Sequence, residues 1–378
     1  MHAFDVVVIG AGIAGATAAA ALARNPATGD PSGMRIALVE AEDAAGYHST
    51  GRSAAIWILN YGPPDVRVLT GLSRDFFDHP PPGFCDAPLG SPRPMLLLAP
   101  PDQLQALGVM LNEGLGLKEI GLDRVREMVP ALRPGYAAAA AIEEDAFDMD
   151  VAALHQGFLR QLRAAGGVLA LRHRAGRIAR EAGQWSIETS GGDVFRAPVI
   201  VNAAGAWGDV VAEHAGLRRI GLQPCRRTGA IIDPAPYIPT DWPMINEVAH
   251  TWYVRPEART KLMVSPADET PMEPHDVQPD ELDIAIAIDR MQQALDIEVR
   301  RVEHSWAGLR SFTPDRNLAF GPDPDAPDFY WFIGQGGYGI QTSPAAGALI
   351  AAMITGRDPG PAGRILANID PGRFRKPA

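Results

Sequence analysis

FDVVVIGAGIAG, at residues 4–15, carries the strongest structural signal in the sequence. Its apolar opening predicts a buried strand, and Gly10, Gly12 and Gly15 follow in G-x-G-x-x-G spacing, ahead of an Ala-rich helix at 16–24. The first N–H groups of such a helix have no partner within it, so with the helix dipole they bind a pyrophosphate. We assign Gly10 to the tight turn, Gly12 to close approach of a phosphate, and Gly15 to close packing of helix on strand.

A second strand is predicted at residues 35–39, and it ends at Glu40. An acidic residue at that point can accept hydrogen bonds from the hydroxyls of an adenosine ribose. The gap between Gly15 and Glu40 is slightly longer than usual, and we interpret the Pro- and Gly-rich residues 25–33 as a loop insertion. This context predicts a dinucleotide site; the alternative is an α/β domain with a glycine turn and no nucleotide.

Length and composition limit the class of protein. A chain of 378 residues suggests two domains, and a formal net charge of −11 disfavours nucleic-acid binding. The two cysteines, Cys85 and Cys225, fit neither a disulfide framework nor a zinc site, and no residues have the spacing of metal ligands. The chain opens on a strand instead of a secretory signal, and no apolar run has the length of a membrane span. We therefore expect a cytoplasmic protein, with peripheral association with a membrane left open.

Periodicity and turn residues divide the rest of the chain into elements. Helices are expected at 66–77, 102–114, 123–129, 150–165, 282–295 and 344–353. Strands are expected at 94–98, at 197–202, 222–232, 252–264 and part of 299–310, and in a meander at 168–174, 176–181 and 185–189. Two further strand–glycine–helix turns, at AAGAWGD and QGGYGIQTS, would return the chain to the nucleotide sheet.

The predicted fold class is therefore α/β, or α+β with two domains: a Rossmann-like βαβ domain for the dinucleotide and a substrate domain built mainly on antiparallel sheet. The dinucleotide domain would be discontinuous, and the material between its pieces would form the substrate domain. We assign residues 1–83, 149–220 and 308–378 to the first domain and residues 84–148 and 221–307 to the second.

The cofactor is predicted to be a flavin because the sequence has a single G-x-G-x-x-G, whereas a second nucleotide domain would usually show another. The last helix follows Gly336, Gly337 and Gly339, so its N-terminus would carry free N–H groups. A reduced flavin is commonly an anion, which a helix N-terminus stabilises. An ordinary glycine turn ahead of a helix is the alternative.

Several long segments resemble the D-amino-acid oxidase superfamily of FAD enzymes, and within it the bacterial D-arginine dehydrogenases. The matching segments cover nearly the whole chain and include GYHSTGRSAA, PPPGFCDAPLGSPRP, VNAAGAW, GLQPCRRTG, HDVQPDELDIA, WAGLRSF and QGGYGIQTS. The resemblance implies noncovalent FAD and oxidation of an amino acid to an imine by hydride transfer to flavin N5, followed by hydrolysis to a 2-oxo acid. The electron acceptor would be a quinone, a dye or O2, and we favour a dehydrogenase.

The resemblance also implies roles for individual residues. Arg227 and Arg310 match two arginines that bind the substrate carboxylate, for which a guanidinium is suited by its planar fork; the adjacent Arg226 would point the other way on a strand. Tyr61 and Tyr253 match tyrosines that contact the carboxylate or amine. Further matches are Gln341 near the amine, Gly337 as a carbonyl acceptor, and His48 in a loop that contacts the flavin. We expect His155, His250 and His304 to be structural or to face solvent.

The glycine turn and the resemblance together predict the full set of cofactor contacts. They comprise Gly10, Gly12, Ala14, Gly15, Glu40, Ala41, His48, Ser49, Thr50, Arg52, Ser53, Ala54, Ala55, Ala175, Ala204, Gly205, Trp207, Gly308, Gly336, Gly337, Tyr338, Gly339, Ile340 and Gln341.

Three wall positions depart from the D-arginine dehydrogenase pattern. Met95 stands where those enzymes have a glutamate that pairs with the substrate guanidinium, and Ile56 and Ile58 replace a histidine and a threonine. A buried cation without a counter-charge is costly, so we expect neutral, hydrophobic or aromatic D-amino acids to be preferred over D-arginine. The remaining candidates for this wall are Trp57, Trp252 and Ile340, and Glu247 and Asp241 are candidates for a replacement anion.

Two other functions are compatible with these residues. Both arginines would suit any carboxylate, so the chain could oxidise 2-hydroxy acids or secondary amines such as sarcosine and proline. A flavoprotein without turnover, acting as a binding factor, is a less favoured alternative because it would not need the full set of arginines and tyrosines.

Overall fold

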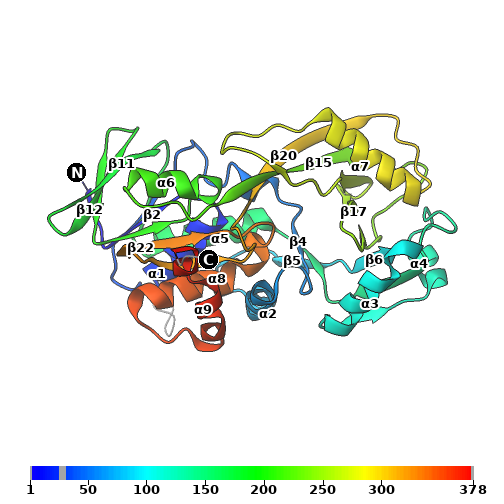
Figure 1. The fold of residues 1–378 in the computed structure, drawn as a ribbon, viewed down its shortest axis with the longest axis horizontal. Coiled ribbons are helices and arrows are strands. Elements are labelled where there is room, and N and C mark those ends of the chain that lie inside the picture. Colours follow the sequence, from blue (N-terminus) through cyan, green and yellow to red (C-terminus); the bar gives the residue numbers. More distant parts are fainter. Residues whose placement is uncertain (1, 25–30, 376–378) are drawn as a thin grey trace.

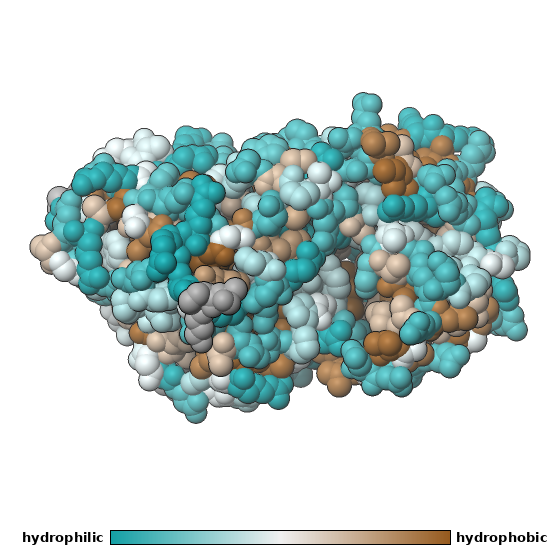
Figure 2. All heavy atoms as spheres, viewed as in Figure 1, coloured by the Kyte–Doolittle hydropathy of each residue, from teal (hydrophilic) through white to brown (hydrophobic). Residues whose placement is uncertain are grey.

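The computed structural model describes residues 2–24 and 31–375, and residues 25–30 of the predicted loop insertion lie outside this range. Figure 1 shows two lobes, one containing α1 (Ile13–Ala23) and α8 (Gly339–Thr355) and the other containing α7 (Glu281–Ala294). Among the described residues no helix combines the length and apolarity needed to cross a membrane. Hydrophilic residues cover most of the face in Figure 2, with scattered hydrophobic ones.

The first lobe is organised around a six-stranded sheet whose first five strands are parallel and whose last, β21, is antiparallel. In sheet order the strands are β10 (Val168–Ala170), β3 (Ile36–Val39), β2 (Val6–Ile9), β14 (Val199–Asn202), β22 (Ala326–Ile333) and β21 (Ala319–Asp323).

Both faces of this sheet are buried under other elements. Successive side chains of a strand point to opposite faces, so each strand contributes to both layers. Val6 and Val8 pack among the helices, and Val7 and Ile9 pack on the other side. The helices on the first side are α1, α2 (Pro64–Asp78), α5 (Val151–Ala164) and α8. The second side is covered by α6 (Gly208–His214) and by a sheet of β1 (His2–Ala3), β13 (Val194–Ala197), β12 (Gln184–Thr189) and β11 (Ala175–Glu181).

The second lobe contains a nine-stranded, mainly antiparallel sheet, in which β16 and β6 form the parallel pair. The path runs β19 (Thr270–Pro271), β15 (Gln223–Ile232), β18 (Lys261–Ser265), β17 (Tyr253–Glu257), β16 (Met244–Glu247), β6 (Met95–Ala99), β8 (Ala139–Glu143) and β7 (Leu117–Glu119), with β20 (Val302–Phe312) on the other side of β15. One face packs against α4 (Leu122–Met128) and α7, and the other lies toward α3 (Leu104–Glu113) and the cavities described below.

A small sheet joins segments from both predicted domains. It consists of β4 (Ile56–Trp57), β9 (Phe147–Met149) and β5 (Gly90–Pro92). The predicted fold class is confirmed by this arrangement of sheets and helices. The residue boundaries between the two domains stay a prediction, and the one proposed at 307/308 falls inside β20.

Four element predictions need correction. The meander loses its first strand, because β10 pairs in parallel with β3. The strand predicted at 197–202 is two strands in different sheets, β13 and β14, and the one at 252–264 is the hairpin of β17 and β18.

The last helix, the fourth case, begins at Gly339, although Pro344 suggested a later start. A proline inside a helix removes the N–H that would bond the carbonyl four residues earlier. The Ser343 hydroxyl instead donates to the carbonyl of Ile340, at 2.9 Å, and so replaces the missing donor. The helix therefore carries Ile340 and Gln341 on its first turn.

Candidate active site

A cavity of about 560 Å³ lies where the parallel strands of the six-stranded sheet end and their helices begin. The glycine turn after β2 forms one wall. Gly10 has φ of +99°, and a Cβ there would lie 2.6 Å from the Ala203 carbonyl oxygen. A Cβ on Gly15 would lie 1.8 Å from the Gly10 carbonyl oxygen, so the helix could not pack this closely on the strand with a larger residue. Gly12 lines the cavity.

Glu40 stands at the end of β3 and joins the glycine turn to the next loop. Its carboxylate accepts from the Ala11 N–H at 2.7 Å and from the Glu42 N–H at 3.0 Å. A carboxylate has about four acceptor positions, so two remain for the hydroxyls of a ribose. Together with the N-termini of α1 and α8, these residues fit an adenine dinucleotide with a second ring system at the far end.

Most of the predicted cofactor residues line this cavity. They are Gly10, Gly12, Ala14, Glu40, Ala41, His48, Ser49, Thr50, Arg52, Ser53, Ala54, Ala175, Ala204, Gly205, Trp207, Gly308, Gly336, Gly337, Gly339 and Ile340.

Four predicted cofactor residues lie elsewhere. Gly15 packs beneath the turn, and Tyr338 is buried with its ring against Tyr61, 4.9 Å between centroids. Ala55 and Gln341 line a second cavity instead.

Some residues that line the first cavity were not predicted from the sequence. His173 and Arg174 reach the cavity because β10 belongs to the nucleotide sheet, which the predicted meander excluded. Glu273 and Pro274 come from the other lobe and lie over the cavity. The Arg52 guanidinium fixes the end of this segment by donating to the Val277 carbonyl at 3.1 Å.

The second cavity, of about 450 Å³, adjoins the first. It is large enough for an amino acid and lies against the face of the nine-stranded sheet that carries Tyr253. Seven residues line both cavities: Ser53, Ala54, Arg227, Tyr253, Arg310, Gly337 and Ile340. A ligand in the second cavity would therefore meet the cofactor at this shared wall.

Arg310 and Tyr61 form the first polar pair of the second cavity. The Arg310 guanidinium donates to the Tyr61 hydroxyl at 2.8 Å. Burial alone would raise the pKa of the Tyr61 phenol, but the positive charges of Arg310 and Arg227 hold that pKa below its ordinary value. The guanidinium has further donors that the phenol does not occupy, so it can bind a carboxylate.

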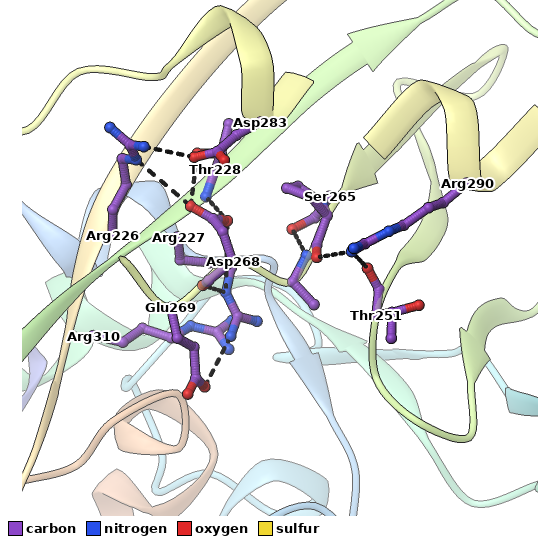
Figure 3. A network of polar contacts seen from close by, with 12 residues as sticks. Arg226, Arg227, Thr228, Thr251, Ser265, Asp268, Glu269, Asp283, Arg290 and Arg310 are labelled. Atoms are coloured by element: carbon purple, nitrogen blue, oxygen red, sulfur yellow. Dashed lines mark hydrogen bonds and ion pairs between the residues drawn. The ribbon is translucent and has the colours of Figure 1, made fainter. Parts of the chain in front are cut away.

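Arg227 is the second cation of this cavity, and Figure 3 shows how it is held. Its Nε donates to the Asp268 carbonyl at 2.8 Å, and its Nη2 donates to the Glu269 carboxylate at 3.2 Å. Glu269 also accepts from Arg316 at 2.8 Å. Arg226 points to the other side of the strand, where it pairs with Asp283, as the alternation along a strand predicts.

Two buried polar atoms of the second cavity have no hydrogen-bond partner among residues 2–24 and 31–375. They are the Tyr253 hydroxyl and Oδ1 of Asn246. Buried polar groups in native proteins are nearly always satisfied, so each of these atoms indicates a ligand or an ordered water. Asn246 is a site residue that the sequence analysis missed, since nothing in the residues around it marks it.

Gln341 lines the second cavity, but its amide is already engaged. Nε2 donates to the Ile58 carbonyl at 3.1 Å and to the Thr70 hydroxyl at 2.8 Å, and Oε1 accepts from the Ile58 N–H at 3.3 Å. This side chain holds the segment at Ile58 in place, and its position near a substrate amine stays a prediction.

The apolar wall differs in part from the expected one. Ile56, Ile58 and Ile340 line the cavity, and so do Met149 and Met244, which were not predicted.

Three expected wall residues lie outside that lining. Met95 is buried behind it, in an apolar cluster with Ile58 and Met244. Trp252 lies in the core on the opposite face of the sheet, and its indole donates to the Tyr136 hydroxyl. Trp57 stacks on Phe147 in the core of the first lobe.

No replacement anion reaches this wall from the expected positions. Glu247 points to the opposite face of the sheet, where it accepts from Gln103 at 2.9 Å, and Asp241 is exposed. In the described lining of the cavity Glu269 is the sole carboxylate, and both Arg227 and Arg316 already bind it.

The three histidines expected to be structural or exposed divide into separate cases. His304 is exposed. His155 is buried, and its Nε2 lies 2.9 Å from the carbonyl oxygen of Ala11 in the glycine turn. His250 is exposed, as expected, and it also lines the second cavity, where desolvation and the charge of Arg227 lower its pKa.

The model of the DAO family, described as FAD dependent oxidoreductase, matches residues 5–353. The chain belongs to this family. Its cofactor is FAD, as the two cavities and the sequence predict. The narrower likeness to D-arginine dehydrogenase is not part of this finding.

Similar proteins act on several kinds of substrate. Among curated relatives of this oxidoreductase, bovine FAD-dependent oxidoreductase domain-containing protein 1 is 25% identical over 174 residues, which cover 41% of this chain and 35% of the relative. One component of the anaerobic glycerol-3-phosphate dehydrogenase of Escherichia coli strain K12 is 27% identical over 251 residues, covering 61% of this chain and 42% of the relative. The chain thus matches less than half the length of either relative.

Solved structures share the fold over nearly the whole chain. L-proline dehydrogenase from P. horikoshii has a TM-score of 0.83 at 21% identity, covering 99% of this chain and 98% of that one. Glycine oxidase from Geobacillus kaustophilus has a TM-score of 0.81 at 19% identity, covering 98% of each chain. At these identities the likeness concerns the fold alone.

Proposed function

We propose that this FAD-dependent oxidoreductase oxidises D-amino acids with neutral side chains to imines, which water hydrolyses to 2-oxo acids and ammonia. The observation that carries the proposal is the shared wall of the two cavities, where Arg310, Arg227 and Tyr253 border both. A carboxylate bound there would hold its own Cα at the border with the cofactor site. The preference for the D configuration rests on the sequence resemblance described above.

The residues of the chain act in this scheme by binding and orientation. Arg310 and Arg227 bind the carboxylate through charge-assisted hydrogen bonds, with Glu269 giving up its bond to Arg227 as the substrate enters. The hydroxyls of Tyr61 and Tyr253 contact the carboxylate or the amine, and the carbonyl of Gly337 accepts a hydrogen bond from the amine. Bound FAD supplies the hydride acceptor. Orientation of Cα–H is then the main contribution of the protein to the rate.

The lining of the cavity supports neutral side chains. Ile56, Ile58, Met149 and Met244 make its wall apolar, and the carboxylate of Glu269 is held by two arginines. A guanidinium or ammonium in the substrate would have no free counter-charge there, which costs several kcal/mol for a buried ion.

Anaerobic reduction of the flavin by a panel of D- and L-amino acids tests this proposal. We expect D-leucine, D-methionine and D-phenylalanine to bleach the flavin, with a kcat/KM at least about tenfold above that of D-arginine and D-lysine. A higher kcat/KM for D-arginine than for D-leucine and D-phenylalanine would overturn the substrate class. If only L-proline, sarcosine, glycine or a 2-hydroxy acid bleaches the flavin, the reaction is one of the alternatives described above.

The electron acceptor and the location are part of the same proposal. We favour a dehydrogenase that passes electrons to a quinone, in the cytoplasm. Comparing peroxide production with quinone reduction during turnover on D-leucine decides the acceptor.

A further inference from the structure

Asn246 lies on β16, with its side chain on the face of the sheet that forms the second cavity. Met244, two residues earlier, lines the same cavity, whereas Ile245 packs into the core of the opposite face and Glu247 bonds to Gln103. This alternation follows the two-residue period of a strand. The direct neighbours of Asn246 across the sheet are Tyr253 on β17 and Leu97 on β6.

The carboxamide of Asn246 is a hydrogen-bonding group without a partner. Its Oδ1 is buried and accepts no hydrogen bond from any of the described residues. Leaving such an acceptor unsatisfied destabilises the fold, and an apolar residue at the same position would avoid this cost. An unpaired acceptor on a side chain that lines the cavity therefore points to a donor that arrives with the ligand.

The order of the strands indicates which part of the ligand brings that donor. Arg227 is on β15, and β18 and β17 separate it from Asn246 on β16. Three strand spacings correspond to about 14 Å along the sheet. The carboxylate is bound at the arginine end under the proposed function, so the side chain of the substrate extends toward Asn246, past Tyr253.

The surroundings of Asn246 indicate the chemistry of that side chain. Met149 and Met244 line the cavity with it, and methionine sulfur makes favourable contacts with aromatic rings. The amide of Asn246 offers no counter-charge to an ammonium or guanidinium, and burying such a group unpaired is costly, so the matching donor is a neutral one.

We propose that Asn246 is a specificity-determining residue that accepts a hydrogen bond from a neutral N–H or O–H on the side chain of the substrate. This inference rests on the proposed function and narrows it. The favoured substrates are D-amino acids with a phenol, an indole or a carboxamide, and D-tyrosine and D-tryptophan combine such a donor with an aromatic body.

Paired substrates and a near-isosteric variant test the role of Asn246. In the holoenzyme we expect kcat/KM for D-tyrosine to exceed that for D-phenylalanine by about tenfold, the effect of one hydrogen bond to a buried acceptor. In Asn246→Leu this ratio should fall to about one, with D-phenylalanine changed less than about threefold. D-Glutamine against D-methionine extends the test to a carboxamide. Met244→Leu, a change on the same strand and face, is the control and should keep the ratio.

A binding measurement separates this inference from the reaction. 4-Hydroxyphenylacetate and phenylacetate differ by the same hydroxyl, and their dissociation constants can be read from changes in flavin absorbance without turnover. Tighter binding of the hydroxylated acid to the wild type, lost in Asn246→Leu, supports the role of Asn246 even if the amino acid panel contradicts the proposed reaction. An equal affinity for both acids in the wild type, or an equal loss for both in Asn246→Leu, overturns it.

Discussion

In the pair formed by Arg310 and Tyr61, the group whose charge can change with pH is the Tyr61 phenol. The phenol accepts a hydrogen bond from Arg310, and the two nearby guanidinium groups hold its pKa below the ordinary value near 10. Once ionised, the phenolate would neutralise Arg310 and repel an incoming carboxylate.

We therefore predict that carboxylate binding weakens as the pH rises toward 10. The dissociation constant of benzoate, which does not titrate above neutral pH, should increase at least about threefold between pH 8 and pH 10 in the wild type. In Tyr61→Phe the same curve should be flat over this range. The measurement is a titration of flavin absorbance in the holoenzyme. Parallel curves for the two proteins would contradict an ionising Tyr61.

Individual side chains show where sequence reasoning succeeded and where it could not. Arg226 and Arg227 were expected on opposite faces of a strand, and β15 places them so. Trp252 and Tyr253 are also adjacent, but their segment is the start of a short strand after a turn, and nothing in the sequence sets which of the two faces the cavity. Asn246 was not foreseen, because an unsatisfied acceptor is visible only once its neighbours in the sheet are known.

At the level of elements, the turn before α8 decides how closely the backbone can approach the carboxylate site. Gly337 lies beside Arg310, and a Cβ built on it would come within 2.8 Å of the Arg310 Nη1 atom and 3.0 Å of the Tyr61 hydroxyl oxygen. A methyl group there must displace one of these groups.

We predict that Gly337→Ala lowers kcat/KM on D-leucine about 100-fold, because displacement of a binding group by about 1 Å has effects of this size. Gly71→Ala is the matched control: its methyl group, on α2, would meet Leu59 at an ordinary 3.6 Å and should leave kcat/KM unchanged. Thermal denaturation should show both variants folded. Equal activity of the two variants would contradict a close approach at Gly337.

The elements themselves were predictable to different degrees. The βαβ unit at the N-terminus follows from its glycines and its apolar strand, and α1 and β3 are where the sequence places them. The start of α8 could not be predicted, because Pro344 is typical of the first turn of a helix. The compensating hydrogen bond from Ser343 to Ile340 depends on the rotamer of the Ser343 side chain. The parallel pairing of β10 depends on contacts with β3, more than 120 residues away.

At the scale of the whole molecule, protonation of His155 makes the stability of the fold depend on pH. It is buried between α5 and the glycine turn, and burial lowers its pKa, although the bond to the Ala11 carbonyl opposes this. The unfolded chain, with a histidine pKa of about 6.5, therefore binds more protons than the folded one just below that pH. Stability contributed by the neutral ring is present above pH 6.5 and is lost as the pH falls through this region.

We predict that the melting temperature of the holoenzyme falls between pH 7.5 and pH 5.5 by about 2 °C more in the wild type than in His155→Gln. The glutamine can donate to Ala11 without taking up a proton. His304→Gln, a change of an exposed histidine, should follow the wild type. If His155→Gln and the wild type lose stability equally, protonation of His155 does not contribute.

The segment from Asp268 to Asp276 includes β19, an edge strand of the nine-stranded sheet, and it borders both cavities. Glu269 lines the substrate cavity, Glu273 and Pro274 line the FAD cavity, and Arg52 pairs with Asp276 at its end. Any displacement of this segment would break the pairing of β19 with β15, withdraw Glu269 from its two arginines and open the substrate cavity. We expect loading of the enzyme to be sequential for this reason: the flavin enters first, and a complete compartment for the amino acid exists only after the same strip of chain has closed over it.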